Sequence, residues 1–361
     1  MATQNLDAVN LGAVPVGGYI REDLMDKIFS IDPIDRPFCD STGSTTAENT
    51  FKEWVMEDLE DATANNAVVD GADAAGNDTR TGERVGNYSQ IASKVVRVSD
   101  RGRQVDTVGS SDELIRQLMR RQKGLKRDEE ATYCSNNIAV PGDGATVAGQ
   151  TAGIGGWIGT GQGAVNTDRG ASGVDPILSG NPGGYPTTKA VAGTKRALSE
   201  TSVKNMMRAA YEKGGNPTVA MSTPAVIEVL SDYLFSSSAR IATLQSEVSQ
   251  GNRTDNGSGG GRSTGGIVAQ GAVNVFVTNY GTLVLTPNRF QPDSAAGAAD
   301  LFLLDTELWE RAYLQGYETK DLARTGTAEN RQITVDFNLC SLNESGSAIV
   351  ADIDYAIPAV V

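Results

Sequence analysis

The chain has 361 residues and a formal net charge of −14, with 45 Asp and Glu against 31 Lys and Arg. This length exceeds that of one typical domain and predicts two lobes, or one domain with large excursions. The acidic balance argues against nucleic-acid binding by bulk electrostatics, because a basic surface is the usual footprint of that function. It favours solubility at high concentration instead, since net charge keeps copies apart.

The sequence lacks histidine and the common catalytic motifs. It has no histidine, which removes the commonest general base and the commonest metal ligand and excludes a Ser-His-Asp or Cys-His site. Neither a GxxxxGK[ST] phosphate loop nor a DxDxDG calcium loop occurs. We therefore expect a protein that is not an enzyme and has no catalytic residues, no metal and no cofactor.

Cysteine usage and hydropathy predict the compartment. Cys39, Cys134 and Cys340 are odd in number and far apart, so they form neither a CxxC pair nor a disulfide framework. The first residues lack the basic segment and continuous apolar core of a signal peptide, and no apolar run is long enough to span a bilayer. We expect a soluble intracellular protein, made in a reducing compartment and without membrane association.

Residues 110–136 predict the longest helix of the chain, around which the rest is arranged. Ser110 and Glu113 have the spacing of a capping box at a helix start. No proline follows within the segment, and at 1.5 Å per residue the helix would be roughly 35 to 40 Å long. Apolar residues at helical spacing predict one buried stripe, made of Leu114, Ile115, Leu118, Met119 and Leu125.

Basic side chains crowd into about three turns of this helix. We call them the basic strip: Arg116, Arg120, Arg121, Lys123, Lys126 and Arg127. One interpretation is a solvated helix face. The other is a surface that meets an acidic partner, which the acidic chain could itself supply.

Residues 50–59 and 88–98 predict two strands that pair as a long hairpin arm, with a polar linker between them. An isolated hairpin is marginally stable in water, so we expect a neighbouring subunit to complete it. Phe51 and Trp54 are its expected packing residues. Acidic residues cluster at its root and are either a solvated surface, a carboxylate site, or a partner for the basic strip of another copy: Glu53, Glu57, Asp58, Glu60 and Asp61.

The remaining segments predict an α+β organisation without strict strand–helix alternation. Leu24, Ile28 and Phe29 share one face of a possible helix near the N-terminus, and the Gly-rich residues 141–193 read as a surface insertion. We expect the last strand, residues 348–353, to form a hairpin with residues 331–342. The other expected elements are helices at 201–213 and 224–233 and strands at 217–221, 273–277, 283–285 and 301–304.

The order of these parts resembles the major capsid (major head) proteins of tailed double-stranded DNA phages, which have the Hong Kong 97-like fold. Within them it is similar to major head proteins of podophages and their relatives. The resemblance covers most of the chain in the expected order, although each block alone is weak. The blocks include REDLMDKIFSIDPIDRPF, FKEWVMEDL, RVGNYSQIASKVVRVS, ELIRQLMRRQKGLKRDEEATY, YGTLVLTPNRF, LFLLDTELWERAYLQGYETKDLARTG and ENRQITVDFNLCSLNESGSAIV.

The resemblance implies a division of the chain. Residues 1–50 would be an N-terminal arm and residues 51–100 an extended hairpin loop (E-loop) that reaches over a neighbouring subunit. The peripheral domain would span 101–215, with a spine helix at about 110–136 and the Gly-rich insertion at about 141–193. The axial domain would span 216–309, and residues 310–361 would return to the peripheral domain as its long strands.

It also implies a structural function. Copies of the chain would self-assemble into hexamers and pentamers of an icosahedral head shell around the phage double-stranded DNA. The protein would be made in the host cytoplasm and end in the virion capsid, with portal, scaffolding and decoration proteins as partners and weak, non-specific contact with packaged DNA. We expect inter-subunit contacts at Phe51, Trp54, Glu57, Asp58, Glu60, Asp61, Arg116, Arg120, Arg121, Lys123 and Arg127.

Two other functions are compatible with the sequence. A bacterial encapsulin would share the fold but enclose cargo enzymes in place of a genome. An enzyme with a carboxylate site would show a deep pocket with carboxylates of perturbed pKa and a small defined oligomer.

Overall fold

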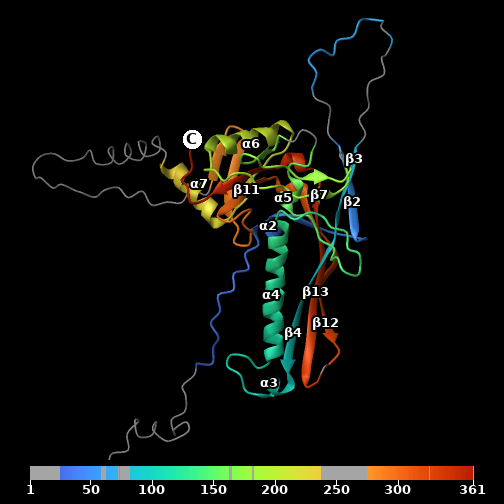
Figure 1. The fold of residues 1–361 in the computed structure, drawn as a ribbon, viewed down its shortest axis with the longest axis vertical. Helices are drawn as coiled ribbons and strands as arrows, with labels where there is room; N and C mark the ends of the chain where they lie inside the picture. Colours follow the sequence, from blue (N-terminus) through green and yellow to red (C-terminus); the bar gives the residue numbers. More distant parts are fainter. Residues whose placement is uncertain are drawn as a thin grey trace, which may run out of the picture.

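The structure is a computed structural model that describes residues 25–57, 62–71, 73, 82–161, 165–180, 183–236, 275–324 and 326–360. A long helix, α4 (Glu113–Tyr133), and a four-stranded sheet form an elongated lobe. This lobe projects from a more compact lobe built on a six-stranded sheet (Figure 1). The mixture of helices and sheets confirms the expected α+β class.

The four-stranded sheet lies along α4 and has the order β1-β12-β13-β4. Its two central strands are 14 residues each and antiparallel, and β4 adds to β13 along ten residues. The short helix α3 (Asp100–Gln104) follows β4 at the far end of this lobe (Figure 1). The strands are β1 (Gly43–Thr46), β4 (Gln90–Ser99), β12 (Trp309–Leu322) and β13 (Ala328–Ser341).

The predicted start of the long helix is wrong. The helix begins at Glu113, and its N-cap is Asp112, whose side chain accepts a hydrogen bond of 2.9 Å from the amide of Leu114. Asp is as good an N-cap as Ser, so the sequence pattern alone did not decide between them. Glu113 is engaged elsewhere, because its carboxylate accepts from the guanidinium of Arg116.

Only part of the predicted apolar stripe is buried. Leu114 and Leu125 are each 1% exposed, and Leu118 packs partly buried against the core. Ile115 and Met119, in contrast, are about half exposed, at 47% and 56%. The sheet therefore covers a narrower face of the helix than the sequence pattern suggests.

The strand pairing of the hairpin arm also differs from the prediction. β2 (Phe51–Met56) pairs with β3 (Glu83–Tyr88), and not with residues 90–98. The latter residues form β4, which pairs with β13 of the same chain. The arm is consequently shorter than expected, and its second predicted strand is stabilised within the subunit.

The six-stranded sheet of the compact lobe has the order β5-β14-β11-β8-β10-β9. Helices α6 (Glu200–Glu212) and α7 (Pro224–Ser236) confirm the two predicted helices and lie over this sheet (Figure 1). The strands are β5 (Thr167–Asp168), β8 (Val219–Ser222), β9 (Val275–Thr278), β10 (Gly281–Pro287), β11 (Ala298–Leu304) and β14 (Ala348–Asp354).

The last strand does not form the predicted hairpin. β14 pairs antiparallel with β11 and parallel with β5, so it belongs to the sheet of the compact lobe. The 3₁₀ turn η2 (Glu344–Gly346) carries the chain from β13 across to it. A second 3₁₀ turn, η1 (Thr306–Leu308), makes the corresponding crossing from β11 to β12. Both turns carry the chain from one lobe to the other.

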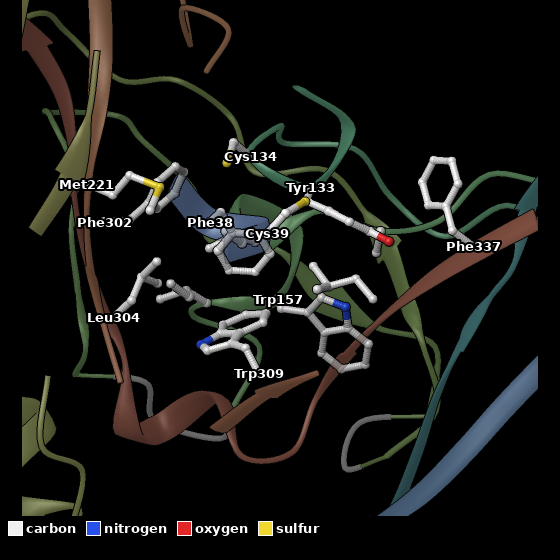
Figure 2. Packing of buried hydrophobic residues seen from close by; sticks show 14 of the residues in the cluster. Phe38, Cys39, Tyr133, Cys134, Trp157, Met221, Phe302, Leu304, Trp309 and Phe337 are labelled. Atoms are coloured by element: carbon white, nitrogen blue, oxygen red, sulfur yellow. The ribbon is translucent and has the colours of Figure 1, made fainter. Parts of the chain in front are cut away.

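A single apolar cluster fills the junction between the two lobes (Figure 2). The rings of Tyr133 on α4 and Trp309 on β12 both pack edge-on against Phe38, at centroid distances of 5.9 and 6.3 Å. Phe38 belongs to α2 (Pro37–Ser41), the first described helix. No helix occurs at residues 25–36, so the predicted N-terminal helix is wrong over the described residues; Ile28 and Phe29 are exposed and Leu24 lies outside them.

The Gly-rich tract is partly core, which corrects its interpretation as a surface insertion. Trp157 on α5 (Ile154–Trp157) and the following Ile158 are fully buried in the junction cluster. Gly153 allows this approach, because a Cβ there would lie 2.3 Å from the carbonyl oxygen of Ser135. The rest of the tract forms loops and the small pair β6 (Ile177–Leu178) and β7 (Pro186–Thr188).

Candidate functional site: charged and aromatic groups around the long helix

The two aromatic residues expected at an inter-subunit contact pack within their own chain. The ring of Phe51 lies 4.5 Å from that of Tyr88 and 5.9 Å from that of Tyr185. The ring of Trp54 lies 5.4 Å from Trp157, the buried tryptophan of α5. Both side chains are only half-buried, so their predicted contact with a second subunit stays a prediction.

The acidic residues at the root of the arm are only partly described. Glu57 is exposed, and Glu53 forms an ion pair with Arg84 across the β2–β3 pair. Asp58, Glu60 and Asp61 lie outside the described residues. Of the two described members, neither Glu53 nor Glu57 forms an ion pair with the basic strip of its own chain, and their contact with another copy stays a prediction.

The basic strip divides into engaged and available side chains. Arg116 bonds Glu113, with 2.7 Å from Nε to Oε2, and Lys123 lies 3.4 Å from the carboxylate of Asp32 in the N-terminal segment. Lys126 and Arg127 sit over the rings of Tyr317 and Phe290, at 5.7 and 4.8 Å from the ring centroids.

Arg120 and Arg121 are the available members of the strip. Both are exposed, and neither has a carboxylate within ion-pair distance among the described residues. The pKa of Asp32 is lowered first by its hydrogen bond from Ser30, and then by Lys123 and Arg120. The positive surface of α4 that is available to a partner is therefore limited to Arg120 and Arg121, and it is smaller than the sequence suggests.

A buried carboxylate that the sequence analysis missed lies on the same helix. Glu129 is fully buried and accepts hydrogen bonds from the hydroxyls of Tyr133, Tyr313 and Tyr317. The guanidinium of Arg36 lies 3.4 Å from its Oε2. Burial first, and then the negative charge of Glu129, raise the pKa of all three tyrosines. This network joins the N-terminal segment, the long helix and β12.

Its neighbour Glu130 fixes the start of α2. The two oxygens of this fully buried carboxylate accept from the amides of Phe38 and Cys39, at 2.9 and 3.0 Å. Oε1 also accepts from the side-chain amide of Asn288 at 2.8 Å. The sequence did contain a signal for one of the pair, because Leu125, Glu129 and Tyr133 are spaced four apart on one helix face.

No cluster of side chains suited to a metal ion is found among the described residues. They contain no group of three or more Cys, Asp or Glu side chains that could hold a metal ion. In the polar hollow beside α3, Arg103 binds Asp112 at 2.8 Å and Arg324 binds Asp100 at 2.5 Å. These charges neutralise one another within the chain. Among the helices of the described segments, none is both long and apolar enough to cross a membrane.

The chain resembles solved capsid proteins over almost its whole length. The capsid protein of an empty GTA particle matches with a TM-score of 0.55, 12% identity and coverage of 95% of this chain and 99% of that one. The capsid protein of cyanophage A-1(L) matches with a TM-score of 0.54, 13% identity and coverage of 93% and 97%. These likenesses concern the fold alone. They assign the chain to the Hong Kong 97-like capsid fold, as the resemblance in sequence implied.

The family follows from the sequence itself. A profile of the SU10 major capsid protein matches residues 2–354, and the chain belongs to this family. The major capsid protein of Escherichia phage Phieco32 is 34% identical over 105 residues. That alignment spans 29% of this chain and 30% of the Phieco32 protein.

Proposed function

We propose that this chain is the shell-forming subunit of a phage head, and that it assembles into hexamers and pentamers which enclose the double-stranded DNA genome. The observation that carries the proposal is the family match over residues 2–354, together with a capsid fold along the same length. The families it belongs to and resembles are structural, and the paired charges around α3 and α4 give no sign of a reacting group.

The proposal assigns roles to the parts of the chain. The arm would be residues 1–50, the E-loop 51–100, the peripheral domain 101–215 and 310–361, and the axial domain 216–309. The six-stranded sheet and the α4 lobe support such a division, although β14 of the last segment belongs to the sheet of the compact lobe. The E-loop would reach a neighbouring subunit beyond the β2–β3 pair, where Glu57 is exposed.

Electron microscopy of the purified full-length chain tests the function. We expect rings or closed shells, which sediment far ahead of a monomer. A chain that stays monomeric, or forms only a small oligomer without rings, at concentrations where capsid proteins assemble would contradict the proposal. Mass spectrometry of the particles separates an encapsulin, which would carry a specific cargo protein, from a head shell.

The available members of the basic strip have a separate test. Replacing Arg120 and Arg121 with alanine should lower particle yield several-fold, because charge complementarity sets register and encounter rate between subunits. Retention of DNA should change less, since the net charge of −14 disfavours strong binding. The matched control replaces Lys204 and Arg208 on the exposed face of α6. Normal assembly with lost DNA retention would reassign the strip to genome contact.

A further inference from the structure

The described part of the hairpin arm meets the body of the subunit at a single bend. β3 ends at Tyr88 and β4 begins at Gln90, so only Ser89 separates them. The two strands nevertheless belong to different sheets, because β3 pairs with β2 in the arm and β4 pairs with β13 in the body. The direction of the arm therefore depends on what holds β3 beside this bend.

The turn between β6 and β7 occupies the second edge of β3. The amide of Gly86 donates to the carbonyl oxygen of Gly184 at 2.9 Å, and the amide of Gly184 donates to the carbonyl oxygen of Arg84 at 2.8 Å. These two bonds form a parallel bridge between Gly184 and Val85. The turn thus adds a third strand to the arm. We call its described residues the bracing turn: Ser179, Gly180, Gly183, Gly184 and Tyr185.

Glycine is required where the bracing turn approaches β3. Gly183 and Gly184 both have a φ of +93°, a left-handed conformation that residues with a Cβ rarely adopt. A Cβ at Gly183 would also lie 2.9 Å from the carbonyl oxygen of Arg84, which is a backbone atom of the arm. The close contact between the turn and the arm therefore depends on this glycine pair.

Aromatic rings add a second contact between the bracing turn and the arm. The ring of Tyr185 packs edge-on against Tyr88 of β3 and against Phe51 of β2, at centroid distances of 5.1 and 5.9 Å. The rings of Phe51 and Tyr88 themselves lie 4.5 Å apart. The turn consequently holds both strands of the arm.

The base of the bracing turn is fixed to the end of α4. The carbonyl oxygen of Pro186 on β7 accepts from the amide of Ala139 at 3.0 Å. The carbonyl oxygen of Ala190 accepts from the side-chain amide of Asn136, also at 3.0 Å. Asn136 and Ala139 follow directly after the helix. The turn therefore connects the arm to the longest helix of the subunit.

A buried asparagine fixes β3 from the opposite direction. Asn87 is fully buried, and its Nδ2 donates to the carbonyl oxygen of Leu339 on β13 at 2.7 Å. Its Oδ1 accepts from the amide of Ala152 at 3.0 Å. The bracing turn and Asn87 together hold β3 on both sides, next to the bend at Ser89.

We propose that the bracing turn fixes the direction of the arm in the free subunit, so that the arm is already oriented for a second copy before assembly. A segment that becomes ordered only on binding loses conformational entropy at that moment, whereas a segment that is already oriented avoids this cost. The Gly-rich tract then positions the arm, in addition to its part in the core. This role rests on the proposed shell function, in which the E-loop reaches a neighbouring subunit.

Pulsed electron paramagnetic resonance on the unassembled full-length chain tests the direction of the arm. Spin labels on Val55→Cys in β2 and Val95→Cys in β4 lie on either side of the bend, and both positions are exposed. The three native cysteines are at most 2% exposed and should stay unlabelled. We expect one narrow distance distribution between the two labels when the bracing turn is unaltered. A broad distribution would overturn the proposal.

Two substitutions in the bracing turn should broaden this distribution. Gly183→Ala forces the turn away from β3, and Tyr185→Ala removes the ring that contacts both strands. The matched controls are Gly214→Ala, at a φ of +89° with nothing within 4 Å, and Tyr211→Ala on the exposed face of α6. A distribution as narrow as that of the controls would overturn the proposal. Tyr185 is only half-buried, so its variant suffices for the test if Gly183→Ala does not fold.

The rate of assembly separates this role from the shell function. Followed by light scattering, the rate should fall several-fold for the variants with a broadened distribution, while their circular dichroism is unchanged. An unchanged rate in such a variant would overturn the role of the bracing turn in assembly. Failure of the unaltered chain to form rings or shells would overturn the shell function, whereas the distances between the labels would still report whether the turn fixes the arm.

Discussion

The two halves of α4 differ in what they bury. In the C-terminal half, the carboxylates of Glu129 and Glu130 are fully buried, while in the N-terminal half Ile115 and Met119 are about half exposed. The difference follows from what packs against each half. The C-terminal half enters the junction between the lobes, where α2, β12 and the Gly-rich tract surround it. The N-terminal half has the four-stranded sheet on one side only (Figure 1).

Burial in the C-terminal half is possible because every oxygen of these two carboxylates has donors. Glu129 has three tyrosine hydroxyls and a guanidinium, and Glu130 has two backbone amides and the amide of Asn288. A buried charge that lacked them would be strongly unfavourable. We infer that the C-terminal half of α4 holds the subunit together, whereas the N-terminal half is available for other subunits.

Of the substitutions that test the difference between the two halves of α4, Glu130→Ala should have the largest effect on stability. It leaves the amides of Phe38 and Cys39 and the side chain of Asn288 without their acceptor. We expect the free energy of unfolding of the unassembled chain to fall by about 3–5 kcal/mol, measured by urea denaturation. The matched control is Glu228→Ala on the exposed face of α7, expected within about 0.5 kcal/mol of the unaltered chain. A loss under about 1 kcal/mol for Glu130→Ala would contradict the role of the C-terminal half.

Gly153→Ala tests the close packing behind the end of α4. The added Cβ would lie 2.3 and 2.8 Å from the carbonyl oxygens of Ser135 and Thr132, which are backbone atoms and cannot rotate away. We expect a loss of about 1–3 kcal/mol by urea denaturation. Gly316→Ala on β12, where the new Cβ meets nothing within 4 Å, is the control and should cost nothing. Equal effects at the two glycines would show that the contact is unimportant.

Tyr317→Phe tests how much one tyrosine hydroxyl contributes to the stability of the Glu129 network. It removes one of three hydroxyl donors, and we expect a loss of about 1–2 kcal/mol because the others remain. The control is Tyr211→Phe on α6, whose side chain is exposed. A loss no larger than that of the control would mean that Tyr317 does not hold the carboxylate.

The same network predicts how stability depends on alkaline pH. The pKa of Tyr133, Tyr313 and Tyr317 is raised in the folded chain above the unfolded value of about 10. The folded state therefore holds these protons more tightly, and their contribution is fully present below pH 10 and is lost as pH rises beyond it. Urea midpoints between pH 9 and about 11 should fall less steeply for Tyr317→Phe than for the unaltered chain. Equal slopes would contradict this origin of the pH dependence.

The smallest effects are expected in the N-terminal half of α4. Ile115→Ser and Arg121→Ala should each change the free energy of unfolding by no more than about 0.5 kcal/mol, because both side chains are exposed and unpaired in the described chain. If particle yield falls for either variant while urea denaturation is unchanged, the comparison between the halves is supported. A loss above about 1 kcal/mol would show that the N-terminal half also stabilises the single subunit.

Local patterns predicted many of the helices and strands, but neither the long strand β12 nor which strands pair. The helices at α4, α6 and α7 and the strands β8 to β11 follow from periodicity and turn residues. The partners of β4 and β14 did not follow, because an alternating pattern gives a strand its two faces but does not select the strand beside it. The Gly-rich tract was misplaced because glycine also serves where backbones approach closely, as at Gly153.

The candidate site was predictable to a similar degree. Residue types gave the basic strip, but only the fold divided it into engaged side chains and the available Arg120 and Arg121. The exposure of Val277 could not be recognised from the sequence, since Val277 and the buried Phe276 differ only in which face of β9 they occupy. Helices α6 and α7, which precede β9 in the chain, pack against one face of the sheet, and this decides which residues of β9 are buried.

The sequence by itself determined the overall composition and net charge of this protein, its family, and the long helix, because these depend on residue types and their spacing. The tertiary structure alone decided which strands pair, which carboxylates are buried, and which apolar residues are left exposed. The physical reason is that the burial of a residue depends on its neighbours in space, and segments distant in the chain supply most of these neighbours. Glu130 illustrates this, since the groups it binds on α2 and beside β10 are 92, 91 and 158 residues away in the chain.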